Sequence, residues 1–141
     1  MTVFCNCYAL RQASRHVTQF YDHALAPSTL RATQYTMLSE IDKRGPISLL
    51  PLAEHMVMDR ATLGHNLRLL ETNGYITLKT GDDRRSREVS LTKAGRRALA
   101  EAEPLWRRAQ DAFEAAIGPD QAAKLREALG RAAAADFTLR P

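Results

Sequence analysis

Apolar residues near the start of the chain recur at intervals of three and four positions. The first such set is Leu10, Ala13, Val17, Phe20, Tyr21 and Ala24. This period predicts an amphipathic helix over residues 6–25, which Pro27 and Ser28 interrupt. The same spacing predicts a second helix over residues 31–43, and Gly45-Pro46 ends it.

Two shorter helices follow, each preceded by a residue that suits an N-cap. Ser48 precedes a helix that extends to about Val57. Asp59 precedes the next helix, which ends at Asn73-Gly74. The predicted buried stripe of that helix is Leu63, Leu67 and Leu70.

The period of the pattern then shortens from 3.6 to 2. The alternating apolar residues are Tyr75, Ile76 and Leu78 in one segment and Val89 and Leu91 in the next. They predict two short strands, and the polar sequence TGDDRRSRE between them is typical of a hairpin loop. Two short helices joined by a tight turn and followed by a hairpin predict a winged helix-turn-helix over about residues 31–92.

The last part of the chain is rich in alanine and has a helical pattern. Thr92 caps a long helix in which Pro104 predicts a kink or a break. Gly118-Pro119 separates a final helix over about residues 120–136.

The predicted fold class is therefore mainly α with a small β-hairpin wing, in one domain over residues 1–141. The helical regions 6–25 and 93–138 flank the winged helix-turn-helix, and their apolar faces exceed what this small domain covers. Such faces are usually buried against a second copy, so we expect a homodimer. No apolar run is long enough to span a bilayer and no signal pattern precedes the first helix, so we expect a soluble, cytoplasmic protein without a membrane partner.

The basic excess of the chain lies in one segment. The net charge is +4, and residues 79–97 account for it. Their basic residues are Lys79, Arg84, Arg85, Arg87, Lys93, Arg96 and Arg97, against the acids Asp82, Asp83 and Glu88. A concentrated basic segment indicates a polyanion such as nucleic acid, and the alternative is a solvated charged face.

Cys5 and Cys7 are the two cysteines of the chain, and their chemistry has several interpretations. A metal site needs three or four converging ligands, and the nearest other donors, His16 and His23, lack metal-binding spacing, so we expect no metal and no cofactor. A disulfide between the two would close a very short, strained loop. They are then either small apolar residues near an interface or sensor thiols.

Residues 52–95 resemble the multiple-antibiotic-resistance regulator (MarR) family. The matching motifs are LA at 52–53, DR at 59–60, LE-x-x-GYI at 70–76, DRR at 83–85 and LT-x-x-G at 91–95. The resemblance implies a homodimeric repressor that binds double-stranded operator DNA, and in which a ligand or an oxidant changes the spacing of two DNA-reading lobes.

The helix after Asp59 is the one expected in the major groove. Its N-terminal half presents Arg60, Thr62, His65 and Asn66 to bases and phosphates. Arg68 lies further along the helix and is expected to meet the DNA backbone. Gly64 and His65 depart from the family, which commonly has a hydroxyl residue followed by arginine there.

The hairpin loop is expected to contact DNA as well. Arg85 is the residue predicted to enter a minor groove, and Asp83 resembles the family aspartate that orients this arginine. Arg84, Arg87 and Lys79 are expected to meet phosphates, and the alternative for each is a solvated charge.

The sequence CYALRQASRHVTQFYDHAL resembles the first helix of the organic-hydroperoxide-sensing (OhrR) branch of the family. The resemblance implies that Cys7 is a reactive thiol and that Tyr21 hydrogen-bonds it across the dimer. A helix N-terminus and the nearby Arg11 favour the thiolate. Ala32 stands where the branch has a second tyrosine, and Cys5, which has no counterpart, is a candidate resolving thiol.

A small-molecule pocket is the competing interpretation of the signal. The residues that would surround a planar aromatic or phenolic acid are Tyr8, Arg15, Tyr21, Arg31 and Tyr35. The alternative for each of these aromatic residues is that it belongs to the hydrophobic core. The sequence contains no phosphate loop, nucleophile elbow or paired carboxylates, so we expect no enzyme activity.

Overall fold

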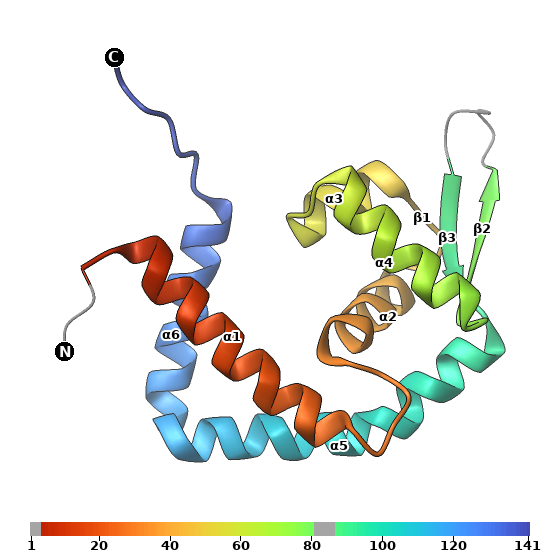
Figure 1. The fold of residues 1–141 in the computed structure, drawn as a ribbon, viewed down its shortest axis with the longest axis horizontal. Coiled ribbons are helices and arrows are strands. Elements are labelled where there is room, and N and C mark those ends of the chain that lie inside the picture. Colours follow the sequence, from red (N-terminus) through yellow and green to blue (C-terminus); the bar gives the residue numbers. More distant parts are fainter. Residues whose placement is uncertain (1–3, 81–86) are drawn as a thin grey trace.

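The structure is a computed structural model that describes residues 4–80 and 87–141. Within them the chain forms six helices and three strands (Figure 1). The elements are α1 (Asn6–Leu25), α2 (Ala32–Arg44), β1 (Ile47–Ser48), α3 (Leu49–Met56), α4 (Arg60–Thr72), β2 (Ile76–Thr80), β3 (Arg87–Leu91), α5 (Lys93–Ile117) and α6 (Pro119–Ala134). The predicted fold class is confirmed: the chain is mainly helical, with a winged helix-turn-helix between long terminal helices.

The sheet contains one strand more than the sequence pattern predicted. The strand order is β1-β3-β2 and both pairs are antiparallel, with Ile47 opposite Val89 and Ile76 opposite Leu91. β1 has two residues, which is too short for an alternating pattern to be recognised. It joins the end of α2 to the wing and so fixes the wing against the helix-turn-helix.

Pro104 lies inside α5, where the sequence predicted either a kink or a break. The helix runs from Lys93 to Ile117 with Pro104 inside it, so the predicted break is wrong. Pro104 is exposed, where the missing N–H and the ring are tolerated on the outer side of a bent helix. Figure 1 shows that α5 changes direction along its length instead of ending.

The core lies where α2 meets α3, α4, the sheet and the first half of α5. Its fully buried side chains include Leu38, Leu52, Leu67 and Val89. The ring of Tyr35 stacks on Trp106 of α5 at a centroid distance of 5.5 Å. This packing buries one face of α4 and leaves the opposite face free.

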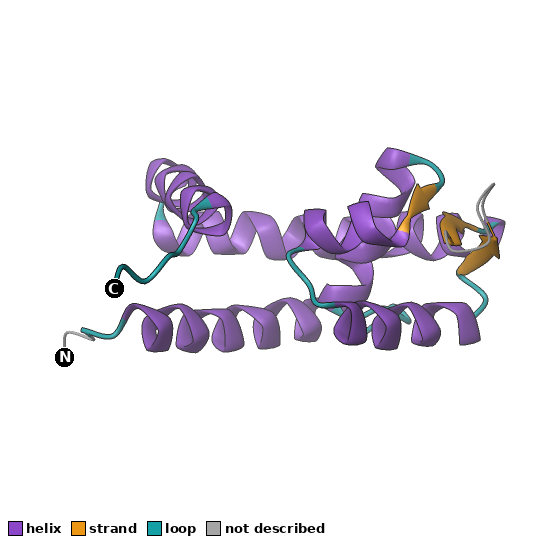
Figure 2. Ribbon diagram, turned by 90° about the horizontal axis from the view of Figure 1, so that it is seen from above, coloured by secondary structure: helices purple, strands orange, loops and turns teal. Residues whose placement is uncertain are grey.

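The terminal helices lie at the other end of the molecule. α1 packs on α5, and α5 packs on α6. Figure 2 shows α1 in a layer separate from that of α6. Among the described residues, no helix combines the length and the apolar composition that crossing a bilayer requires.

Candidate nucleic-acid interface and sensor region

Asp59 fixes the start of α4. Its Oδ1 accepts the backbone N–H of Thr62 at 2.8 Å, and its Oδ2 accepts the Thr62 hydroxyl at 2.8 Å. The backbone hydrogen bond from Thr62, with the hydroxyl bond beside it, lowers the pKa of the Asp59 carboxyl. The cap therefore stays ionised near neutral pH and orients the first turn of the helix.

The outer face of α4 carries most of the predicted reading residues. Arg60, Thr62, His65 and Arg68 are exposed, whereas the predicted stripe Leu63, Leu67 and Leu70 is buried. Asn66 differs, because it is half-buried and its Nδ2 donates to the Thr62 carbonyl at 2.9 Å. Its amide is thus partly used within the helix, as short polar side chains often are.

β2 and β3 are the two strands of the wing. Arg87 begins β3 and is exposed, and Lys79 is exposed opposite Glu88 on the neighbouring strand. The predicted contact residues Asp83, Arg84 and Arg85 lie outside the described residues. Of the basic residues next to the wing, Arg96 forms an ion pair with Asp42 at 3.8 Å.

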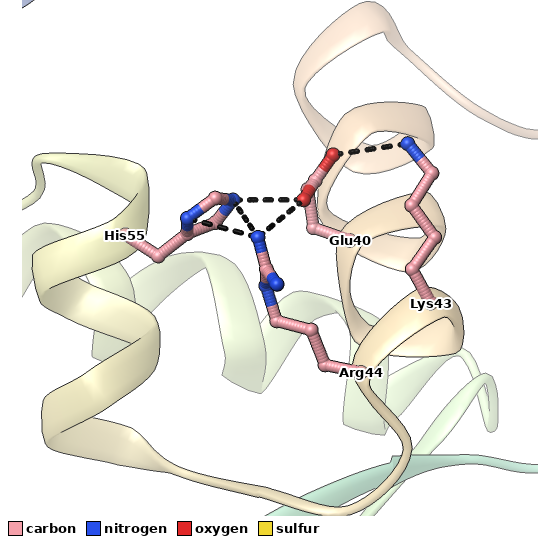
Figure 3. Close-up of polar contacts among 4 residues, drawn as sticks. All are labelled: Glu40, Lys43, Arg44 and His55. Atoms are coloured by element: carbon pink, nitrogen blue, oxygen red, sulfur yellow. Dashed lines mark hydrogen bonds and ion pairs between the residues drawn. The ribbon is translucent and has the colours of Figure 1, made fainter.

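A polar cluster that the sequence did not indicate joins α2 to α3 (Figure 3). The carboxylate of Glu40 contacts Lys43 at 3.3 Å, Arg44 at 3.3 Å and His55 Nε2 at 2.8 Å. Burial alone would raise the pKa of the Glu40 carboxyl, but the hydrogen bonds from His55 and Lys43 outweigh it, and the pKa is lowered. The spacing of Glu40, Lys43 and Arg44 signals the part within α2. Nothing in the sequence signals the contact with His55.

The two cysteines lie at the first turn of α1. Cys5 is the N-cap of the helix, and its Sγ accepts the backbone N–H of Tyr8 at 3.4 Å. Cys7 is in the first turn, and both thiols are free and exposed. The capping role of Cys5 was not predictable from the sequence, because cysteine is not among the preferred N-cap residues.

The five residues proposed for a ligand pocket do not share one cavity within the protomer. Tyr21 lies in the wall of a cavity of about 230 Å³, together with Val17, Thr18, Ala32, Thr36 and Trp106. Tyr8 is thirteen residues earlier on the same helix, about 20 Å away along its axis. Tyr35 is buried, and Arg15 and Arg31 are exposed.

Tyr21 already has a hydrogen-bond partner on α5. Its hydroxyl donates to Gln110 Oε1 at 2.7 Å. Burial, and secondarily the charge of Glu114, raises the pKa of the Tyr21 hydroxyl. The phenol is therefore neutral at physiological pH.

An open apolar groove separates α1 from α6. Its volume is about 1060 Å³, and its wall includes Leu10 and Val17 of α1, Phe113 of α5 and Leu129 of α6. Leu10 is 46% exposed and Leu129 is 41% exposed, so the groove presents apolar surface to solvent in the protomer.

The exposed polar face of α4, the wing and the flanking helices define a winged helix-turn-helix regulator. The MarR family model matches residues 30–86, which span α2 through β2 and end immediately before β3. The M. tuberculosis transcriptional regulator MosR, solved in complex with DNA, is 34% identical, with a TM-score of 0.85 over 92% of this chain and 93% of that chain. This protein belongs to the MarR family of transcriptional regulators, which are DNA-binding regulators and not enzymes.

Two further relatives are similar to this chain. The organic hydroperoxide resistance transcriptional regulator of Bacillus subtilis is 30% identical over 90 residues, which cover 63% of this chain and 61% of the relative. The repressor CouR, solved on a 23-mer DNA duplex, is 28% identical, with a TM-score of 0.82 over 92% of each chain.

Proposed function

We propose that this protein is a homodimeric repressor that binds operator DNA through α4 and the wing. The observation that carries the proposal is the division of α4 into a buried leucine stripe and an exposed face with Arg60, Thr62, His65 and Arg68. A helix that is held in this way at the surface of a winged helix-turn-helix enters the major groove. The basic residues of the wing then contact the backbone and the adjacent minor groove.

The groove between α1 and α6 supports the homodimer. A second copy of the chain offers the same apolar faces, so a two-fold axis would bury both grooves at once. The two α4 helices would then read two half-sites of one operator. The distance between the two α4 helices depends on how the terminal helices pack. A signal that changes the packing of α1 would therefore change the fit of the two α4 helices to DNA.

The signal that we propose is oxidation of Cys7 by an organic hydroperoxide. The Cys7 thiolate attacks the terminal oxygen of the hydroperoxide and forms an S–O bond as the O–O bond breaks. The sulfur becomes a sulfenic acid, and the alkoxide leaves and takes a proton from water to become the alcohol. The exposed position of Cys7 in the first turn of α1 supports this chemistry. Because its hydroxyl donates its one hydrogen to Gln110, Tyr21 would donate to a thiolate across the dimer only after exchanging that bond.

The test is the binding of the reduced protein to a duplex from upstream of its own gene, followed by fluorescence anisotropy. We expect binding that weakens steeply with salt, release by cumene hydroperoxide and recovery with a thiol reductant. Cys7→Ser should bind DNA and ignore the oxidant. Cys5→Ser is the matched control, because serine preserves the N-cap of α1.

The outcomes separate the parts of the proposal. A wild-type protein that binds DNA but is not released by the oxidant would overturn redox control and leave the repressor. A protein that binds no duplex at low salt would overturn the repressor itself. A Cys5→Ser variant that also ignores the oxidant would make Cys5 a participant in the switch.

The second candidate signal is an aromatic acid, and the cavity beside Tyr21 and Trp106 favours it. A structure of CouR bound to p-coumaroyl-CoA is 25% identical to this chain, with a TM-score of 0.81. Trp106 is the one tryptophan of the chain, so its fluorescence reports binding at this cavity directly. We expect a hydroxycinnamic or hydroxybenzoic acid to quench it under this alternative, with weaker binding in Tyr21→Phe and no change in Tyr8→Phe.

A further inference from the structure

The guanidinium of Arg68 lies over a glycine on the exposed face of α4. Gly64 is one helical turn before Arg68, and a Cβ atom at Gly64 would lie 3.4 Å from Arg68 Nη1. Ala61, a further turn back on the same face, carries only a methyl group. Ala61 and Gly64 thus form a shallow track on this face, and the arginine side chain extends over Gly64 toward the start of the helix.

This position places the charge of Arg68 near the middle of the reading face. Helical side chains lean toward the N-terminus, so the guanidinium is about one turn, ~5 Å, ahead of its own Cα. It is then level with Gly64 and His65, in the half of the helix that enters the groove. Arg68 is exposed and forms no ion pair with the carboxylates of the described residues, so its donors are available to DNA.

We propose that Arg68 reads a guanine in the major groove and that Gly64 is its positioning residue. The inference rests on the proposed DNA binding and assigns part of its specificity. A planar guanidinium donates two parallel hydrogen bonds to the O6 and N7 atoms of guanine, which no other base offers in that arrangement. The track at Ala61 and Gly64 also lets the backbone of α4 approach the base edges more closely than a helix with larger residues at these positions.

The experiment selects binding sites for the wild-type protein from a random duplex library and then compares variants on the selected site. Each conserved guanine is replaced in turn by 7-deazaguanine, which retains base pairing but lacks the N7 acceptor. We expect one such guanine per half-site at which wild-type affinity falls about 10- to 100-fold. Arg68→Ala should bind the unmodified site more weakly by a similar factor and should no longer respond to that replacement.

Two substitutions at Gly64 test the positioning role. Gly64→Leu fills the track and should lose discrimination at the same guanine, and the double variant with Arg68→Ala should lose little more. Gly64→Ala is the control, because its methyl group makes only an ordinary contact at 3.4 Å and the arginine can stay in place. Circular dichroism confirms that each variant is folded.

The contrary results are distinct. Arg68→Ala could instead lower affinity equally for all sequences and reduce the slope of log affinity against log salt concentration by about one. Arg68 would then contact a phosphate, and the inference would be wrong. If Gly64→Leu discriminates as well as the wild type, Gly64 has no positioning role. If the wild type selects no sequence and binds no duplex, the proposed function itself fails, and the inference fails with it.

Discussion

At the scale of single residues, Gly95 shows why the motif that closes the wing ends in glycine. A Cβ atom at this position would lie 2.1 Å from the carbonyl oxygen of Tyr75, which is backbone and cannot rotate away. The same contact region holds the cap of α5, where Thr92 Oγ1 accepts the N–H of Gly95 at 3.0 Å and donates to the Gly74 carbonyl at 2.6 Å. The end of α4, the start of β2 and the start of α5 thus meet with no space for a side chain.

We therefore expect Gly95→Ala to lower the free energy of unfolding by about 3 kcal/mol, with the wing displaced from α5. Gly130→Ala is the control, because Gly130 lies in α6 with no heavy atom within 4 Å of its would-be Cβ. That variant should gain about 1 kcal/mol from helix propensity. Urea unfolding at a fixed protein concentration measures both, and equal effects of the two substitutions would contradict the steric argument.

Val57 carries backbone strain at the turn between α3 and α4. It is the C-cap of α3 with φ of 52°, a left-handed conformation that a β-branched residue rarely adopts. Its side chain is 70% exposed, so little packing compensates for the strain. We expect Val57→Asn to raise the free energy of unfolding by about 1 kcal/mol and Val57→Ala to raise it less. Thermal unfolding measures the change in stability. A loss of stability in Val57→Asn would show that contacts of the valine side chain contribute more than relief of the backbone strain.

At the scale of elements, the Glu40 cluster links α2 to α3 in a manner that depends on pH. The pKa of Glu40 is lowered in the folded state from its usual value of 4.5, so ionised Glu40 stabilises the fold above that value. This stability is lost as the pH falls through the lowered pKa. The contact between α2 and α3 through His55 should weaken in the same range.

We expect Glu40→Gln to be less stable than the wild type at neutral pH, and the difference to shrink between about pH 5 and pH 3. Urea unfolding across this range tests it. Glu127→Gln is the control, because Glu127 pairs with Arg131 at an exposed site where such a pair contributes little. A Glu40→Gln difference that is unchanged at acid pH would show that the carboxylate does not act through its charge.

The sequence predicted the long elements well, because each has a period and a stop of its own. α1, α4 and the Asp59 cap of α4 follow from local spacing, and Gly118 ends α5 as expected. β1 was missed because a strand of two residues is defined by its partner β3 and not by its own pattern. The break at Pro104 was wrong because an exposed position on a long packed helix tolerates the ring.

The candidate site was predictable to the extent that it lies on one helix. The exposed face of α4 follows from its buried stripe, whereas the back-bonding of Asn66 and the bond from Tyr21 to Gln110 depend on neighbours. The five-residue pocket was proposed from residue types, and the placement of its members likewise depends on neighbours: Tyr8 and Tyr21 share a helix, but thirteen residues separate them along its axis. Tyr35 belongs to the core through its stack on Trp106.

At the scale of the whole molecule, the two proposed interaction surfaces lie at opposite ends of the protomer. α4, the helix proposed to read DNA, lies at one end, and the apolar groove of α1 and α6 lies at the other (Figure 1). If a second copy fills the groove, two reading helices act on one duplex. Binding at the second half-site is then intramolecular, which raises the affinity by about 100-fold or more without any new contact to DNA.

Leu129→Glu tests this arrangement, because it places a charge in the groove at a residue that is 41% exposed in the protomer. We expect a monomer by light scattering, and affinity for a two-half-site operator reduced about 100-fold. Binding to an isolated half-site should be unchanged, since α4 is untouched. Leu139→Glu is the matched control: Leu139 is 97% exposed, lies outside the groove wall and should leave both the dimer and the affinity intact. If Leu129→Glu stays dimeric, the second copy packs elsewhere; if it becomes monomeric and yet binds the full operator as the wild type does, the two half-sites are not read together.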